Sequence, residues 1–312
     1  MSTEILLFIL FNVFILLMLA IDLGVFNRKA HSISVKEAVV WSVIWTLLAL
    51  VFNVGVYYWS GTTKALEFFT GYLVERALSF DNIFVFVLIF SYFGVPSRLH
   101  HRALFWGVVG ALVTRSLFIA AGAALINRFE WVLYIFGLIL IVSGWKMITS
   151  DSLEVHPDKN VFIRMARKVF PVAPGFETGT FFRRIDGILH ATPLFLVLLT
   201  IETTDIVFAV DSIPAVFGVT QDPFIVYTSN VFAILGLRAT YFLLAGVMDT
   251  FHYLSHGLSF VLIFIGLKML LDHFVTIPVG ISLLVVGVIL TVAVVASLVK
   301  RRSDRKRESA AP

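Results

Sequence analysis

The residues best suited to chemistry in this sequence are two pairs of carboxylates inside apolar stretches. Glu75 and Asp81 lie six residues apart in the stretch VERALSFDNIF. Asp205 and Asp211 repeat that spacing in the stretch TDIVFAVDSIP. Charged groups are costly at membrane depth, so the few that occur there are usually functional. We therefore interpret the two pairs as the two halves of one site.

The donors around these acids are all oxygens, which points to a particular class of metal. Carboxylate, carbonyl and hydroxyl oxygens favour Mg, Ca or Mn over Zn or Cu. The chain has no cysteine, which excludes disulfides, thiolate metal sites and thiol chemistry. The candidate metal ligands are Glu75, Asp81, Asn82, Glu202, Asp205, Asp211 and Ser212.

Basic residues inside the apolar stretches are candidate charge partners or gates for these acids. They are Arg115, Lys146, Arg238 and Lys268, and Asp22 is a further acid of the same kind. Six acids facing four bases leave an excess of negative charge that would suit a divalent cation, although Arg76 or a protonated acid could cancel it. Two alternatives stay open at this point. The charges could form a closed ion-pair network that pins the helices together, and Asp22 and the two lysines could be anchors near the membrane surface.

Composition and apolar run lengths define the class of protein. Of the 312 residues, 59% are hydrophobic and 14% are charged, whereas soluble domains carry about 25% charged residues. Runs of about 20 apolar residues can span a bilayer as helices. We predict an all-α polytopic membrane protein with about nine transmembrane helices. The predicted spans are 4–26, 38–60, 66–94, 101–126, 131–149, 190–218, 224–249, 256–274 and 278–299.

The basic residues predict the orientation of these spans. With the N-terminus outside, seventeen of the 24 Lys and Arg residues fall in cytoplasmic segments and two in outer loops. Cytoplasmic loops of membrane proteins carry such an excess of positive charge. The C-terminus is then cytoplasmic, and the high pI is no sign of a nucleic-acid partner. Within the long loop, residues 161–170 could form a short helix at the membrane surface.

Landmarks recur along the chain and predict an internal repeat. Arg115 precedes Lys146 of GWKM by 31 residues, and Arg238 precedes Lys268 of GLKM by 30. The repeat unit therefore has three spans, and an odd number places the second unit upside down relative to the first. Inverted repeats are a recurring design of transporters. We expect one transmembrane domain with a cytoplasmic tail: domain 1–300, core repeats 66–149 and 190–274, loop 150–189, and basic tail 301–312.

Local chemistry also predicts breaks in the two acidic helices. Pro214 cannot donate a backbone hydrogen bond to the carbonyl of Val210. Asn82 and Ser212 can form local hydrogen bonds that compete with the helix. We expect unwinding around residues 79–82 and 209–214, which would free carbonyl oxygens for a cation.

At these residues the sequence resembles the TerC/Alx family of bacterial integral membrane proteins. The resemblance depends on ERALSFDN, ETTDIVFAVDSIPAVF, SNVFAILGLRATYFLLAG and GLKM, and it covers nearly the whole chain. It implies the fold of the LysE-like transporter superfamily and a place in the bacterial inner membrane. It also implies manganese efflux and metal homeostasis, with a historical link to tellurium resistance. The acids named above lie in the family's motifs.

Three functions from different classes follow. The first is a secondary transporter that exports divalent cations, with Mn²⁺ as the expected substrate and proton antiport as a possible coupling. The second is a membrane-bound redox modulator or stress-response protein without transport activity. The third is a scaffold for other proteins. We expect no enzyme activity and no tightly bound cofactor, and the partners are the lipid bilayer and the cation. Neither the oligomeric state nor Mn²⁺ over Ca²⁺ can be read from the residues.

Overall fold

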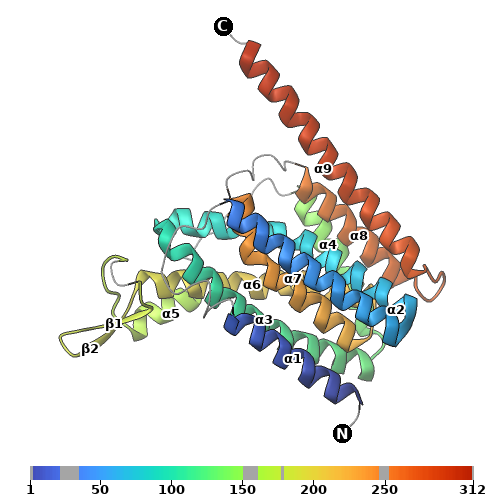
Figure 1. Cartoon of the computed structure of the whole chain (residues 1–312), viewed down its shortest axis with the longest axis horizontal. Coiled ribbons are helices and arrows are strands. Elements are labelled where there is room, and N and C mark those ends of the chain that lie inside the picture. Colours follow the sequence, from blue (N-terminus) through green and yellow to red (C-terminus); the bar gives the residue numbers. More distant parts are fainter. Residues whose placement is uncertain (1–2, 22–34, 150–160, 177–178, 246–252, 311–312) are drawn as a thin grey trace.

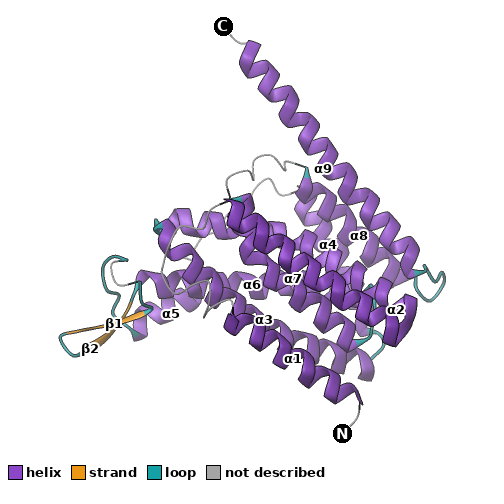
Figure 2. Cartoon of the chain, in the orientation of Figure 1, coloured by secondary structure: helices purple, strands orange, loops and turns teal. Residues whose placement is uncertain are grey.

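The computed structural model describes most of the chain, and that part is helical. It covers residues 3–21, 35–149, 161–176, 179–245 and 253–310. Within these ranges nine helices and one small sheet form (Figures 1 and 2). The helices are α1 (Thr3–Ile21), α2 (Val35–Phe93), α3 (Ser97–Arg128), α4 (Val132–Thr149), α5 (Val161–Val169), α6 (Pro193–Phe217), α7 (Pro223–Leu244), α8 (Leu254–Leu271) and α9 (Val279–Ala310).

A short antiparallel hairpin is the one non-helical element of the described chain. Strand β1 (Phe182–Ile185) pairs with β2 (Ile188–Ala191), and Phe182 lies opposite Ala191. The hairpin lies at the end of the predicted loop 150–189 and extends two residues into the predicted span 190–218. Asp186, which has a positive φ of 50°, and Gly187 make its two-residue turn, as is usual for tight hairpins.

Helix α2 is folded back on itself at one glycine. Its 59 residues would extend about 88 Å if straight, far beyond the thickness of a bilayer. The rings of Phe52 and Phe68, sixteen positions apart, nevertheless lie 5.3 Å from each other. The chain reverses at Gly61, whose φ of 85° and ψ of 177° are accessible to glycine alone among common residues. Helix α2 therefore supplies two arms, which match the separate predicted spans 38–60 and 66–94.

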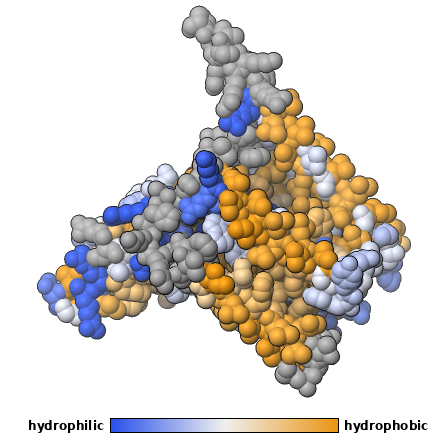
Figure 3. All heavy atoms as spheres, in the orientation of Figure 1, coloured by the Kyte–Doolittle hydropathy of each residue, from blue (hydrophilic) through white to orange (hydrophobic). Residues whose placement is uncertain are grey.

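Six of the described helices are long and apolar enough to cross a membrane. They are α2, α3, α4, α6, α8 and α9. Helix α1 has a shorter apolar stretch, and α7 is buried on nearly all sides by its neighbours. The predicted class of multi-spanning helical protein is confirmed, while the count of nine crossings stays a prediction. Apolar side chains cover much of the outer surface (Figure 3).

Helices from the two predicted repeats pack mainly against each other. Helix α2 has its most extensive contact with α7, and α4 has its most extensive contact with α8. Glycines allow α4 and α8 to cross closely. A Cβ added to Gly137 would lie 2.9 Å from the carbonyl oxygen of Gly266, and one added to Gly266 would lie 2.6 Å from that of Gly137. The core is thus built from helix pairs that are distant in sequence.

At each end of the bundle a polar contact joins helix ends that are distant in sequence. At one end, Lys64 pairs with Asp222 at 3.1 Å. At the other, the hydroxyl of Tyr241 and Nδ1 of His100 lie 3.1 Å apart. These pairings bring together segments that the predicted topology places on the same side of the membrane.

Candidate functional site

Arg115 lies at the centre of the predicted acidic region and joins three helices. Its Nη1 donates to Glu75 Oε2 at 2.8 Å. Its Nε and Nη2 donate to Asp205 Oδ2 at 3.2 Å and Oδ1 at 3.0 Å. Nη1 also donates to Ser212 Oγ at 3.0 Å. One guanidinium from α3 therefore holds carboxylates from α2 and α6.

This cluster is buried deep in the bundle. Arg115 is 3% exposed, Glu75 2% and Asp205 3%. A buried ion pair stabilises only when its geometry is good and its remaining hydrogen-bonding groups are satisfied. The two-point contact of Arg115 with Asp205 meets the first requirement. Asn230 of α7 supports the other carboxylate, because its Nδ2 donates to Glu75 Oε1 at 2.6 Å.

The side-chain oxygen of Asn230 accepts no hydrogen bond from the described residues. This atom, Oδ1, is buried. A buried carbonyl oxygen without a partner is rare and calls for an explanation. Here the oxygen belongs to a side chain that already contacts Glu75. It is therefore a spare neutral oxygen ligand on a side chain that contacts the Glu75 carboxylate.

Glu202 lies one helical turn before Asp205 and contacts a different neighbour. Its carboxylate packs against Gly110 of α3, where any Cβ would overlap it. Among the described residues no hydrogen bond reaches this half-buried carboxylate. Glu202 is thus a carboxylate close to the cluster that is not committed to Arg115.

The second acid of each predicted pair bonds a serine of the opposite repeat. Ser255 of α8 donates to Asp81 Oδ1 of α2 at 3.2 Å. Ser143 of α4 donates to Asp211 Oδ1 of α6 at 2.6 Å. Each bond joins the first helix of one predicted repeat to the third helix of the other. Asp81 and Asp211 therefore each bond a serine across the bundle, and among the described residues neither is hydrogen-bonded to Arg115.

The predicted unwinding of the two acidic helices is wrong. Helix α2 is helical through residues 79–82, and α6 is helical through residues 209–214, Pro214 included. Ser79 does not compete with the helix, because its hydroxyl donates to the carbonyl of Glu75 at 2.7 Å within it. Ser212 is occupied by Arg115. Helix packing on both sides thus outweighs the local tendency to break, and the helical backbone offers a cation few carbonyl oxygens beyond that of Val210, which Pro214 leaves without a donor.

The predicted charge partners have different settings. The guanidinium of Arg238 lies 5.9 Å from the ring centre of Phe105. Lys268 is buried and donates to the carbonyl of Gly218 at 3.1 Å, at the end of α6. Lys146 is exposed. Asp22 lies outside the described residues.

The structure therefore brings together part of the predicted ligand set. Glu75, Asp205 and Ser212 meet at Arg115, and Asn82 is buried on α2, where among the described residues no hydrogen bond joins it to them. Within the described residues, no three acids or histidines are already arranged around a common point for a metal. The sequence reasoning missed Asn230, Ser143 and Ser255. Asn230 had a usable signal, since it lies in the stretch SNVFAILGLR that precedes and includes Arg238.

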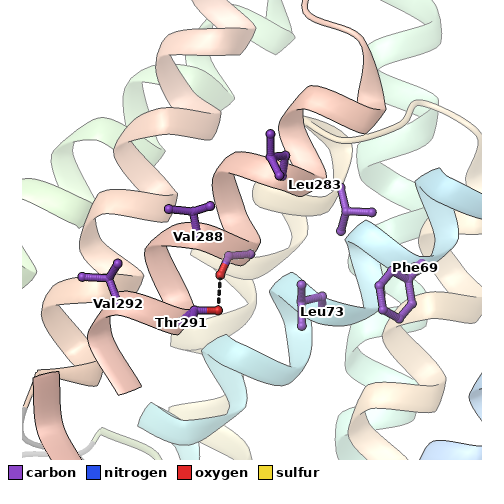
Figure 4. Close-up of a pocket in the computed structure, with 8 residues that line it drawn as sticks. Phe69, Leu73, Leu283, Val288, Thr291 and Val292 are labelled. Atoms are coloured by element: carbon purple, nitrogen blue, oxygen red, sulfur yellow. Dashed lines mark hydrogen bonds between the residues drawn. The ribbon is translucent and has the colours of Figure 1, made fainter. Parts of the chain in front are cut away.

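A cavity elsewhere in the protein is unsuited to an ion. It has a volume of about 460 Å³ and lies between α2 and α9, lined by Phe69, Leu73, Leu283 and Val288 among others (Figure 4). The hydroxyl of Thr291 is already bonded to the carbonyl of Gly287 at 2.7 Å. This apolar cleft faces the outside of the bundle, so the buried charges remain the candidate site.

These features define a multi-pass helical membrane protein with an arginine-bridged carboxylate cluster in its core. The chain belongs to the TerC family of integral membrane proteins, because residues 60–307 match the model of that family. It is 49% identical to an uncharacterized membrane protein of Myxococcus xanthus, over 97% of this chain and 95% of the relative.

Enterobacterial relatives carry a more specific name. The chain is 46% identical to a Salmonella typhi protein named as a candidate membrane-bound redox modulator, Alx, over 95% of both chains. The Escherichia coli K12 protein of the same name is 45% identical, over 95% of this chain and 96% of the relative. No solved structure matches this chain.

Proposed function

We propose that this protein is a secondary transporter that moves divalent cations, with Mn²⁺ as the preferred substrate, out of the cytoplasm. The observation that carries the proposal is the guanidinium of Arg115 held between the carboxylates of Glu75 and Asp205. A cation already occupies the space between two buried acids. In the proposed cycle the transported cation takes that place, and Arg115 withdraws from it.

The charge balance of the cluster supports a divalent substrate. With Arg115 in place, Glu75 and Asp205 keep one uncompensated negative charge. A divalent cation that replaced Arg115 between them would balance both carboxylates, and the withdrawn Arg115 would then need another counter-charge. An uncompensated charge is expensive in a low-dielectric interior, so the site favours the doubly charged ion over a monovalent one.

The available donors fit a hard cation. Two carboxylates, the hydroxyl of Ser212 and the spare Oδ1 of Asn230 are all oxygens. Such sets suit Mg, Ca and Mn. The choice of Mn²⁺ among these comes from the family resemblance, and the donor chemistry agrees with it.

The helix pairing supports an inverted-repeat transporter. The bonds Ser255–Asp81 and Ser143–Asp211 relate α2 to α8 in the way that they relate α6 to α4. Gly137 and Gly266 meet where α4 crosses α8. In inverted-repeat transporters the substrate site lies near mid-membrane between the two repeats. The Arg115 cluster lies between helices of the two predicted repeats, α2 and α3 from the first and α6 and α7 from the second, which supports this comparison.

Glu202 is the proposed coupling group. It lies beside the cluster and has no hydrogen-bond partner among the described residues, so it is available for a proton or for the incoming cation. On α6 it precedes Asp205, which places it on the cytoplasmic side of the cluster in the predicted topology. Proton antiport through Glu202 would couple export to the proton gradient.

A transport assay on everted vesicles tests the proposal directly. Mn²⁺ uptake should fall roughly tenfold or more for Asp205→Asn and for Glu75→Gln, as for the loss of a group that supports a metal site. Glu130→Gln removes an exposed carboxylate outside the cluster and should transport like the wild type. Wild-type rates for both cluster variants would refute the site, and no uptake by the wild-type protein would refute the function.

The relatives named as redox modulators motivate a second candidate function. The absence of cysteine from this chain means that such a function would need a redox group other than a thiol. The two candidates predict different readouts. A redox role predicts a change in membrane redox state on deletion with cellular Mn²⁺ unchanged, and transport predicts the reverse.

A further inference from the structure

Helix α5 packs beside the β1–β2 hairpin in one unit, and it carries an exposed stripe of apolar side chains. Phe162 is 55% exposed, Met165 57% and Val169 68%. Residues three and four positions apart share one face of a helix, so these side chains form a continuous stripe. Ile163 is fully buried and fixes the adjacent face of α5 to the protein.

Cations flank this stripe. Arg164 and Lys168, four positions apart, lie along one side of α5 and are exposed. The neighbouring hairpin adds exposed Arg184 together with exposed Ile188 and Leu189. Figure 3 shows this lobe, at the left of the molecule, with hydrophilic and hydrophobic atoms side by side. Basic residues that border an apolar face are typical of helices that lie on anionic membranes.

The unit is firmly connected to the helix that holds the acids. Thr192, which precedes α6, donates its hydroxyl to the carbonyl of Thr180 at 2.6 Å. The ring of Phe182 lies 4.6 Å from that of Phe195 on α6. Figure 1 places α5 and the hairpin beside one end of α6. A force on this unit therefore acts on the start of α6.

We propose that α5 and the β1–β2 hairpin form a docking surface for anionic phospholipids. The stripe of Phe162, Met165 and Val169 inserts among the acyl chains, while Arg164 and Lys168 contact phosphate groups. The partner is a lipid surface, because the unit lies at the end of a transmembrane bundle and its exposed charges are mainly positive. Docking holds the first turn of α6 at a fixed height in the membrane.

The absence of native cysteine makes a site-by-site test simple. Single cysteines at 162, 164, 165, 168 and 169 would carry a nitroxide label in the full chain, reconstituted in vesicles. Collisions with oxygen report acyl chains, and collisions with a water-soluble nickel complex report water. Leu284→Cys on the exposed apolar face of α9 is the lipid reference, and exposed Glu130→Cys is the water reference.

The expected result is a helical pattern that depends on lipid charge. In vesicles of phosphatidylethanolamine with phosphatidylglycerol, labels at 162, 165 and 169 should match Leu284, and labels at 164 and 168 should report water. In phosphatidylcholine alone the first three should become more accessible to nickel. Each basic residue at such a surface contributes about fivefold to binding, so Arg164→Gln with Lys168→Gln should lower the docked-to-undocked ratio roughly 25-fold.

Three results would overturn the proposal. A label at Met165 that stays in water in both lipids would exclude docking. If the labels at 162, 165 and 169 are equally immersed in both lipids and in the Arg164→Gln, Lys168→Gln variant, recognition of anionic lipid is excluded. Strong spin–spin broadening at 165 would show a second copy of the chain on this face. None of these readouts depends on transport, so they are independent of the proposed substrate.

Discussion

Arg115 grips Asp205 at two points, with Nε 3.2 Å from Oδ2 and Nη2 3.0 Å from Oδ1. Two parallel bonds fix the orientation of a guanidinium as well as its distance, which a lysine cannot do. The helices α3 and α6 are therefore held in one rotational setting at the depth of the proposed site. Transport through this site requires the two bonds between Arg115 and Asp205 to break and form again.

Arg115→Gln should destabilise the protein strongly, because it leaves Glu75 and Asp205 buried without a counter-charge. The loss expected for breaking a buried ion pair is about 3–5 kcal/mol. Thermal unfolding in detergent, followed by intrinsic fluorescence, measures it. The combined Arg115→Gln, Asp205→Asn variant removes one stranded charge and should recover part of the loss. A double variant no more stable than Arg115→Gln would contradict the account of the cluster.

Gly110→Ala should impair transport, since its new methyl group would occupy the place of the Glu202 carboxylate. The effect should appear as a lower rate of Mn²⁺ uptake in everted vesicles. Gly110→Ala combined with Glu202→Ala makes room for the methyl group. This double variant should be about as stable as the wild type but should not transport Mn²⁺. If Gly110→Ala alone transports normally, the carboxylate is not needed at that position.

The Asp and Ser of each bond should be energetically coupled, so their substitutions should not be additive in unfolding free energy. Substitutions in different bonds should be additive. A double-mutant cycle on Ser143→Ala and Asp211→Asn should give an interaction of about 0.5–3 kcal/mol, as for residues in contact. The mixed cycle of Ser143→Ala with Asp81→Asn is the control and should be close to additive. Unfolding free energies supply both values, and equal coupling in the two cycles would argue against discrete bonds.

Gly61→Ala should destabilise the hairpin of α2, because alanine is strained at φ 85° and ψ 177°. The expected cost is about 1–3 kcal/mol. Space is not the cause, since nothing lies within 4 Å of an added Cβ at this position. Gly280→Ala has equally open surroundings without the positive φ, so its effect should stay within about 0.5 kcal/mol. Similar losses in both variants would refute the conformational explanation.

The sequence predicted the helical membrane class and the acidic stretches because both depend on local features. Run length and composition report a spanning helix wherever it packs, and Gly61 lies between two predicted spans. Which side chains meet was harder to predict. The bond from Arg115 to Asp205 joins residues 90 positions apart, and it depends on how α3 and α6 are rotated about their axes.

The error about unwinding has the same origin. Pro214 and Asn82 favour a break when only near neighbours are considered. In the folded bundle, Pro214 is buried with most of the last turns of α6, and the helix persists through it. Asn230, Ser143 and Ser255 escaped notice because a single polar residue on an apolar helix becomes meaningful only when its partner across the bundle is known.

The bond from Lys268 to the carbonyl of Gly218 has a mechanical consequence. An ammonium at the tip of a flexible chain can turn about its acceptor without losing the hydrogen bond. The C-terminal end of α6 is therefore bound to α8 by one bond that permits rotation. The middle of α6 is held in one orientation by the two bonds from Arg115 to Asp205. Release of Asp205 by Arg115 would leave α6 attached to α8 at this end and to α4 through the bond between Asp211 and Ser143.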